Sequence, residues 1–166
     1  MIKYNVKFKK LLACLRYDTD SEFTFHTPNY NGEAHMCAKH VLEAFTNGEK
    51  EDDRYFGENG SLNKDVEPTR QYHISRVIYF MNHPELIVDI RVKSAWWMQD
   101  NKVCSHPHLQ IEDGYHRVLA GICLGWEDES VEIVNYDYIR QDVLDYLLYD
   151  SYQLPKTMRY IDINLL

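Results

Sequence analysis

Hydrophobic residues in the N-terminal part of the chain follow two different spacings. Residues 1–17 alternate between apolar and polar side chains and then become apolar, which predicts one or two strands. Residues 33–45, EAHMCAKHVLEAF, place apolar side chains on one face of a helix, which Asn47 and Gly48 end. Residues 49–68 are polar, acidic and punctuated by glycine, and they predict a long loop with little order of its own.

Helices and strands alternate in the C-terminal part. Residues 72–82 have helical spacing and end before Pro84, and residues 138–149 predict a closing helix. Short β-branched or alternating runs predict three strands, at residues 86–92, 108–113 and 131–136. A further helix is predicted at residues 117–124, with Gly125 as its cap. This order favours an α+β (mixed α/β) fold, a single domain with a small mixed sheet and flanking helices.

A pair of tryptophans, Trp96 and Trp97, falls in a predicted loop between the first two of these strands. Paired tryptophans can stack on a base or anchor a protein partner. They can equally cover the end of a small core. The sequence leaves both alternatives open.

Composition places the chain among globular proteins and limits the classes of partner that it is expected to bind. It has 166 residues, of which 45% are hydrophobic and 27% charged, as expected of one ordinary domain. The net charge is -8, so nonspecific DNA binding is not expected. The four cysteines are widely spaced, without a secretory signal or an apolar run of about 20 residues. We therefore expect a cytoplasmic protein with no membrane partner.

One segment, LQIEDGYHRVLAGICLGW at residues 109–126, combines charged residues with a change from strand to helix. A strand that ends at Asp113, turns at Gly114 and begins a helix near Tyr115 presents free backbone N–H groups and the positive end of a helix dipole. Such a point binds anions, above all phosphate. The segment therefore predicts a phosphate-binding turn.

The side chains of this turn suit a nucleotide. Gly114 permits a positive φ or the close approach of a ligand, and Arg117 offers two donors to phosphate oxygens. His116 can donate a hydrogen bond or move a proton, and Glu112 or Asp113 can hold Mg²⁺ or accept a proton. In the alternative interpretation, Asp113 only caps the helix and Arg117 pairs with one of the two carboxylates.

The order of strand, D-G-x-H-R turn, small-residue helix VLAGICLG and strand VEIV resembles the central unit of the ParB/sulfiredoxin-like superfamily. The preceding helix, HISRVIYFMN, and the strand LIVDI fit the same pattern, so the resemblance covers residues 72–136. It implies binding of a nucleoside triphosphate, ATP or CTP with Mg²⁺, at residues 114–117. Phosphates would lie against Gly114, His116 and Arg117, with Tyr115 inside the turn.

The chain departs from two branches of that superfamily. Sulfiredoxins carry a catalytic cysteine where this chain has Tyr115, so sulfinic-acid repair is not expected. Partition proteins have an arginine in place of His116 and a helix-turn-helix domain afterwards, where this sequence has only residues 137–166. DNA segregation is therefore not expected either.

The resemblance divides the chain into an N-terminal extension, residues 1–71, a ParB/sulfiredoxin-like core, residues 72–136, and a C-terminal helix and tail, residues 137–166. The expected function is that of an ATP-dependent phosphotransferase or nucleotide hydrolase acting on a small molecule or protein. The alternative is a non-catalytic, protein-binding accessory or inhibitor protein of phage or plasmid origin.

Three auxiliary residues and one metal hypothesis complete the candidates. His73 and Arg76, near the start of a helix, could face the turn, and Asp89, at the end of a strand near the same edge, could join a metal site. Arg76 could instead be a paired or solvated helix residue, and Asp89 an exposed carboxylate.

Cysteine and histidine also cluster in the sequence, at Cys37 and His40 and again at Cys104, His106 and His108. These spacings do not define a zinc site, so no metal ligands are assigned to them. Cys37 and Cys123 are expected in the core as small hydrophobic side chains.

Overall fold

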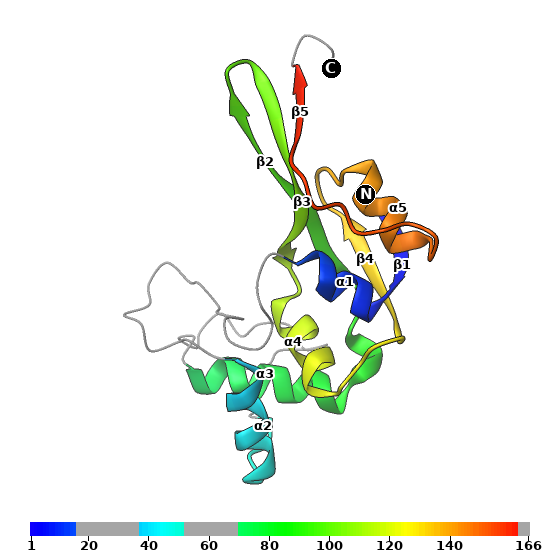
Figure 1. The fold of residues 1–166 in the computed structure, drawn as a ribbon. Helices are drawn as coiled ribbons and strands as arrows, with labels where there is room; N and C mark the ends of the chain where they lie inside the picture. The colour runs from blue at the N-terminus through cyan, green and yellow to red at the C-terminus, as the bar shows by residue number, and fades with distance from the viewer. Residues whose placement is uncertain (16–36, 52–69, 163–166) are drawn as a thin grey trace. The chain divides into compact units, whose positions relative to one another are not determined.

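The computed structural model describes residues 1–15, 37–51 and 70–162 (Figure 1). Its contacts divide the chain into two compact units, which are described separately. We call them the sheet unit, Met1–Arg16, Val88–Gly114 and Glu127–Leu166, and the helical unit, Tyr17–Ile87 and Tyr115–Trp126. The predicted α+β class with a small mixed sheet is confirmed.

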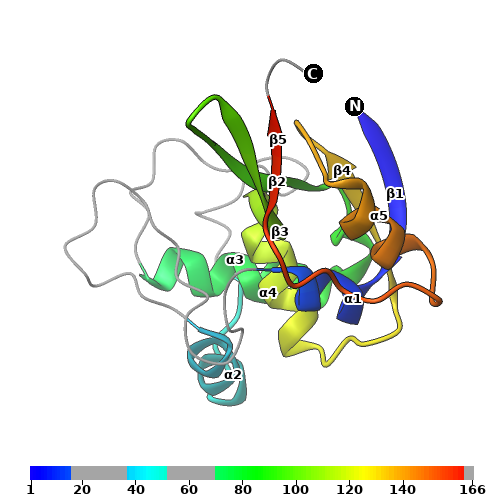
Figure 2. The same ribbon diagram turned by 45° about the horizontal axis from the view of Figure 1, so that its top comes forward.

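The sheet unit contains a five-stranded sheet in the order β1-β4-β2-β3-β5, as far as the described residues go. Its strands are β1 (Ile2–Lys7), β2 (Ile90–Gln99), β3 (Lys102–Asp113), β4 (Ser130–Asn135) and β5 (Arg159–Asp162). The β2–β4 pair is parallel and the other pairs are antiparallel. Figure 2 shows β5 beside β3 and β1 beside β4.

Strand β2 is longer than predicted and begins later. Residues 84–86 form a short 3₁₀ helix instead of the start of a strand. The strand then runs through Trp96 and Trp97 to Gln99, so the loop predicted there is wrong. Asp100 and Asn101, with φ of 48° and 60°, make a two-residue turn back into β3. Two consecutive residues in the left-handed conformation form a tight hairpin turn. Asp100 and Asn101 therefore connect β2 directly to β3.

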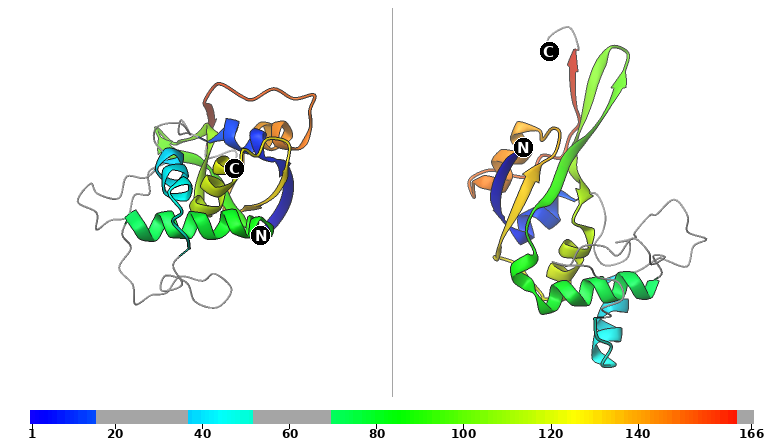
Figure 3. Two further views of the ribbon diagram at one scale, coloured as in Figure 1. Left: turned by 90° about the horizontal axis from the view of Figure 1, so that it is seen from below. Right: turned by 180° about the vertical axis from the view of Figure 1, so that it is seen from behind.

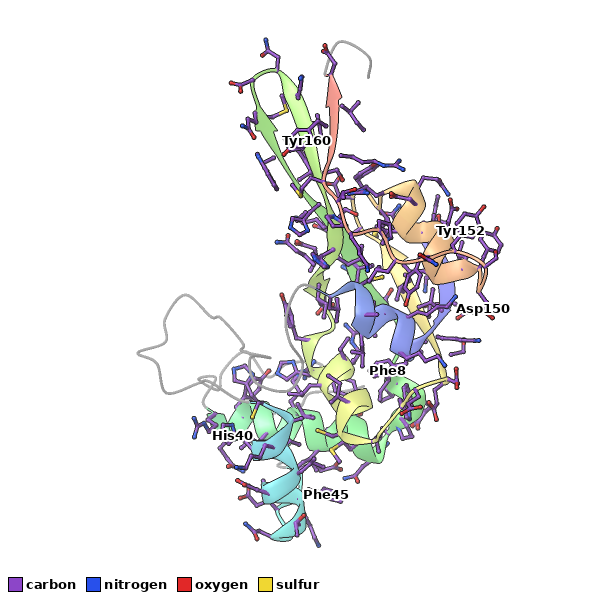
Figure 4. The ribbon with its side chains drawn as sticks, viewed as in Figure 1. Phe8, His40, Phe45, Asp150, Tyr152 and Tyr160 are labelled. Carbon is purple, nitrogen blue, oxygen red and sulfur yellow. The ribbon has the colours of Figure 1, made fainter. Side chains whose placement is uncertain are left out.

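Two helices of the sheet unit, α1 (Phe8–Cys14) and α5 (Gln141–Leu148), lie close to each other and to β1. The strand predicted for the second half of residues 1–17 is wrong from Phe8 onward. Phe8, Leu11 and Cys14 recur at helical spacing and are fully buried. Figure 4 labels Phe8 on α1. The predicted closing helix is confirmed, although it begins at Gln141.

The sheet unit also buries one arginine, Arg140, which is 1% exposed. Its Nε and Nη2 donate to the two carboxylate oxygens of Asp142, at 3.0 and 2.7 Å. Its Nη1 donates to the carbonyl oxygens of Ser105 and Thr157, at 3.0 and 2.7 Å. Because every contact is charge-assisted, the guanidinium ties together β3, α5 and the segment before β5.

The helical unit consists of α2 (Ala38–Thr46), α3 (Arg70–Asn82), η3 (Pro84–Leu86) and α4 (Tyr115–Cys123). Within it, α3 contacts both α2 and α4 (Figure 3). The helices predicted at residues 72–82 and 117–124 are confirmed.

Helix α4 ends at its predicted glycine. Gly125 has a φ of 71°, and its N–H donates to the Ile122 carbonyl at 3.0 Å. The Trp126 N–H donates to the Gly121 carbonyl, also at 3.0 Å. These two bonds form a Schellman motif, which satisfies carbonyls at the helix end.

Helix α2 ends before Asn47 and Gly48, as predicted. Residues 33–36 of the predicted helix and 52–68 of the predicted loop lie outside the described residues. In the described ranges, no helix is long and apolar enough to cross a membrane. The boundaries expected at residues 71 and 136 stay a prediction.

Candidate functional site

The predicted change from strand to helix is confirmed at the D-G-x-H-R turn. Strand β3 ends at Asp113 and helix α4 begins at Tyr115. The predicted site residues are shared between the two units along the chain. The sheet unit holds Asp89, Glu112, Asp113 and Gly114, and the helical unit holds His73, Arg76, Tyr115, His116 and Arg117.

Gly114 adopts the positive φ that the sequence suggested, at 109°. A Cβ atom at this position would lie 3.2 Å from the Ile90 Cα and 3.3 Å from two Ile90 side-chain carbons. Glycine is therefore required here by the packing of β3 against the start of β2. The close approach of a ligand to Gly114 stays a prediction.

The acidic residues of the sheet unit have basic neighbours. Glu112 Oε1 lies 2.7 Å from Lys93 Nζ on the adjacent strand. Asp89 Oδ2 lies 3.5 Å from Arg91 Nη2, and Oδ1 lies 3.9 Å from Lys3 Nζ. Asp89 precedes β2 with a φ of 55° and does not end a strand, so its predicted position is wrong. Its interpretation as a paired surface carboxylate fits these contacts.

Helices α3 and α4 bring two of the predicted residues, His73 and His116, into direct contact. His73 Nδ1 lies 2.8 Å from His116 Nε2, and the rings are stacked with 5.1 Å between centroids. Tyr72 meets both rings edge-on, with centroid distances of 4.9 and 6.1 Å. A bond between two imidazole nitrogens needs one donor and one acceptor, so the pair shares a single proton between them.

Both histidines are held neutral. Burial lowers the pKa of His73 from 6.5 to about 4, and the charge of Arg76 adds to the effect. The pKa of His116 lies well below 6.5, first because of desolvation and then because of His73, Arg76 and Arg117. The positive charge of Arg76 acts on both imidazoles and that of Arg117 on His116, so both arginines favour the neutral form of the pair.

Arg76 is positioned by an aromatic ring. Its guanidinium carbon lies 5.5 Å from the centre of the Phe80 ring, one helical turn further along α3. This cation–π contact keeps the positive charge on the helix surface that carries His73. The alternative interpretation of Arg76, a paired helix residue, is compatible with the same contact.

Two cysteines lie outside the core in which the sequence predicts them. Cys37 and Cys123 are both only partly buried. Cys37 is the N-cap residue of α2, with its Sγ 3.7 Å from His40 Nδ1. The C-x-x-H spacing of Cys37 and His40 resembles a metal-binding motif. It is also the spacing of a capping box, which joins the N-cap residue to the third residue of the helix.

The hypothetical zinc ligands do not form a cluster. Cys37 and His40 belong to the helical unit, and Cys104, His106 and His108 belong to the sheet unit. The rings of His106 and His108 are tilted by 35° to each other, with their centroids 4.8 Å apart. Within the described ranges, no three metal-ligating side chains come together.

A second feature of the sheet unit is a group of exposed large side chains around the β2–β3 hairpin. We call it the hairpin surface and define it by Trp96, Trp97, Met98, Tyr138 and Tyr160, which are 39% to 58% exposed. Because successive strand residues face opposite sides of a sheet, Trp97 and Tyr160 share one face and Trp96 and Met98 lie on the other. Figure 4 shows Tyr160 on β5 beside the hairpin. Two hollows of about 490 and 240 Å³ adjoin it, and Trp96 and Asp137 line both.

Comparison with known proteins gives no match: no family model, no curated protein and no solved structure matches this chain. The resemblance to the ParB/sulfiredoxin-like superfamily therefore stays a prediction.

Proposed function

We propose that the chain is a nucleotide-binding protein of the ParB/sulfiredoxin-like kind that holds the phosphates of ATP or CTP at the start of α4. It would act as a phosphotransferase or nucleotide hydrolase on a small molecule or protein. The observation that carries the proposal is the neutral His73–His116 pair beside Arg76 and Arg117. Local charge thus favours an anion although the whole protein is acidic.

Each helical-unit residue has a defined part in this proposal. Arg117 and the backbone N–H groups at the start of α4 bind phosphate oxygens. His116 donates a hydrogen bond to the bound anion. An anion near His116 also opposes the effects that lower its pKa, so phosphate binding draws a proton onto the pair. The bound complex then holds an imidazolium that neutralises charge on the phosphates.

Mg²⁺ keeps several waters and is usually bound by one or two carboxylates and the phosphates of the nucleotide. Glu112 or Asp113, at the end of β3, would be the carboxylate that holds it. When bound, Mg²⁺ would neutralise charge on the phosphate oxygens.

The test is calorimetric titration of the protein with ATP and with CTP, each with and without Mg²⁺, followed by a phosphate-release assay. We expect binding in the micromolar to millimolar range and uptake of protons, which appears as a dependence of the measured heat on the ionisation enthalpy of the buffer. An absence of binding at millimolar nucleotide would refute the proposal. Binding without phosphate release would refute only the enzymatic part.

A second candidate function, binding of a protein partner without catalysis, is favoured by the hairpin surface. Large aromatic side chains and methionine are enriched at the centres of protein interfaces. The exposed fractions of Trp96 and Trp97, 47% and 42%, are high for tryptophan, and Trp96 Nε1 lies 3.4 Å from Asp137 Oδ2. Under this function, substitutions on the hairpin surface abolish binding of the protein partner, and substitutions at Arg117 leave that binding unchanged.

A further inference from the structure

Two cysteines and one histidine of the helical unit lie around the first turn of α2. Cys37 is the N-cap residue and His40 is the third residue of the helix. Figure 4 labels His40 on α2. Cys123, the last residue of α4, places its Sγ 3.9 Å from the carbonyl oxygen of Ala38. Both cysteines are free thiols. The first turn of α2 therefore lies near two thiols, that of Cys37 at its N-cap and that of Cys123 at the end of α4.

The ring of His40 is oriented to accept the proton of the Cys37 thiol. The Cys37 backbone N–H donates to His40 Nδ1 at 3.2 Å, so Nδ1 carries the lone pair and the neutral ring holds its proton on Nε2. The Cys37 Sγ lies 3.7 Å from the same Nδ1. Nδ1 thus faces the sulfur as a base, and after proton transfer it faces the thiolate as a donor.

The backbone of α2 stabilises negative charge on this sulfur. The His40 backbone N–H donates to the Cys37 carbonyl oxygen at 3.1 Å, and the Cys37 side chain occupies the N-cap position of a capping-box pattern. The sulfur therefore stands at the positive end of the helix dipole. A helix N-terminus and an adjacent imidazolium are the two features that most often favour the thiolate of a reactive cysteine.

Cys123 differs from Cys37 in its surroundings. Burial raises the pKa of Cys123 to about 12, and the charge of Cys37 adds to the rise. Helices α2 and α4 contact each other, so the two cysteines approach across one helix pair. One thiol is suited to attack an oxidant, and the other is kept protonated beside it.

We propose that Cys37 is a peroxide-reactive thiol, with His40 as its proton acceptor and Cys123 as the thiol that resolves the oxidised product. The Cys37 thiolate attacks one peroxide oxygen and the O–O bond breaks. The departing oxygen takes the proton from His40 and leaves as an alcohol, or as water from hydrogen peroxide. Cys37 is then a sulfenic acid. Attack by the Cys123 sulfur forms a disulfide and releases water, and a dithiol reductant returns both thiols.

A hollow of about 630 Å³ beside these residues indicates the class of peroxide. Ala38, which follows Cys37, and Ile122, which precedes Cys123, both line it together with Leu42. Lys39, Glu43, Thr46 and Asn47 complete the lining, so the hollow presents apolar side chains to the hydrocarbon part of a small organic hydroperoxide and polar ones to its oxygens.

The experiment mixes the reduced, full chain with cumene hydroperoxide and follows free thiols and mass. We expect two thiols to be lost per peroxide consumed, a disulfide mapped to Cys37 and Cys123, and full reversal by dithiothreitol. In Cys123→Ser, dimedone should trap a sulfenic acid on Cys37. Cys104→Ser is the matched control, because that buried thiol should not change the rate. A disulfide through another cysteine, or none, overturns the proposal.

His40→Gln separates the base from the cap. Glutamine at this helical position can still accept from the N-cap backbone N–H, but it cannot take a proton. We expect the reaction of Cys37 with peroxide at pH 7 to slow by about a hundredfold, the lower end for loss of general base catalysis. A rate equal to that of the wild-type protein overturns the assignment of His40.

A measurement on the wild-type protein guards against a variant that fails to fold. In the wild-type protein, iodoacetamide should alkylate Cys37 faster than it alkylates the buried Cys104. A Cys37 that is alkylated no faster than Cys104, or that reacts with peroxide no faster than glutathione, contradicts the proposal.

Discussion

His73 Nδ1 and His116 Nε2 are 2.8 Å apart, and the contact joins the first turn of α3 to the first turn of α4. Both rings are neutral, because burial and the neighbouring arginines lower the two pKa values. Protonation of either ring would place a positive charge at this contact between two packed helices.

Acid should destabilise the protein through His73. Its pKa is about 4 when folded and about 6.5 when unfolded, so the unfolded chain takes up a proton between these values and the folded protein does not. Stability is therefore full above pH 6.5 and falls as the pH drops toward 4. We expect wild type to lose about 2 kcal/mol more than His73→Gln between pH 7 and 4.5, by urea unfolding. Equal losses in the two proteins would contradict this.

Arg117→Ala should weaken nucleotide binding by about 1.5 to 3 kcal/mol, the range for a hydrogen bond to a charged group. Calorimetric titration with ATP and Mg²⁺ measures the loss. The matched control is Arg159→Ala on β5, an exposed arginine that pairs with Asp142 and should leave binding unchanged. If Arg117→Ala unfolds the protein instead, the arginine belongs to an internal ion pair and the partner-binding function gains support.

His116→Gln should separate binding from turnover. Glutamine can keep a hydrogen bond to His73, but it cannot gain or lose a proton. We expect nucleotide affinity to change by less than about threefold, while phosphate release falls by about a hundredfold. Proton uptake on binding should also disappear from the buffer-dependent heat. Unchanged uptake would show that another group takes the proton.

Gly114→Ala should destabilise the sheet unit with or without a nucleotide. The residue has a φ of 109°, and the new Cβ would lie 3.2 Å from the Ile90 Cα. A strained backbone of this kind costs about 1 to 3 kcal/mol. Gly48→Ala is a suitable control, because its φ is 80° and its Cβ would meet no atom within 4 Å. Thermal unfolding should rank Gly114→Ala as the more damaging substitution, and the reverse order would reject the packing explanation.

Trp97→Ser tests whether the hairpin surface covers the core. The side chain is 42% exposed, so its loss should cost less than about 1 kcal/mol of unfolding free energy. Leu119→Ala, at a fully buried position in α4, should cost about 2 to 5 kcal/mol in the same experiment. A comparable loss for both variants would assign Trp97 to the core and weaken the case for a binding surface.

Local patterns predicted well those elements whose character is set by neighbouring residues. Helix α3 and strand β4 were found because one apolar periodicity runs through each. The run FKKLLAC of α1 fits both a strand and a helix at this length, and the buried positions of the fold decide for the helix. Strand β5 has four residues and pairs only through β3, so nothing in its own sequence identifies it.

The candidate site divides in the same way. The turn at Gly114 was predictable because a carboxylate, a glycine and a helical pattern follow one another directly. The His73–His116 bond joins residues 43 positions apart, and only the packing of two helices creates it. The pairing of Glu112 with Lys93 depends on the register of β2 against β3, which includes a bulge that no local pattern reveals.

The position of β1 has a consequence for the synthesis of the protein. This strand precedes the other described elements in the sequence, yet its partner within the described sheet is β4, with Ile2 opposite Asn135. The N-terminal strand must therefore remain unpaired until most of the chain has been made. Pairing at such long sequence separation is slow. Lys3 and Lys7 place positive charges on β1 while it is unpaired. Charged side chains protect exposed strands against aggregation.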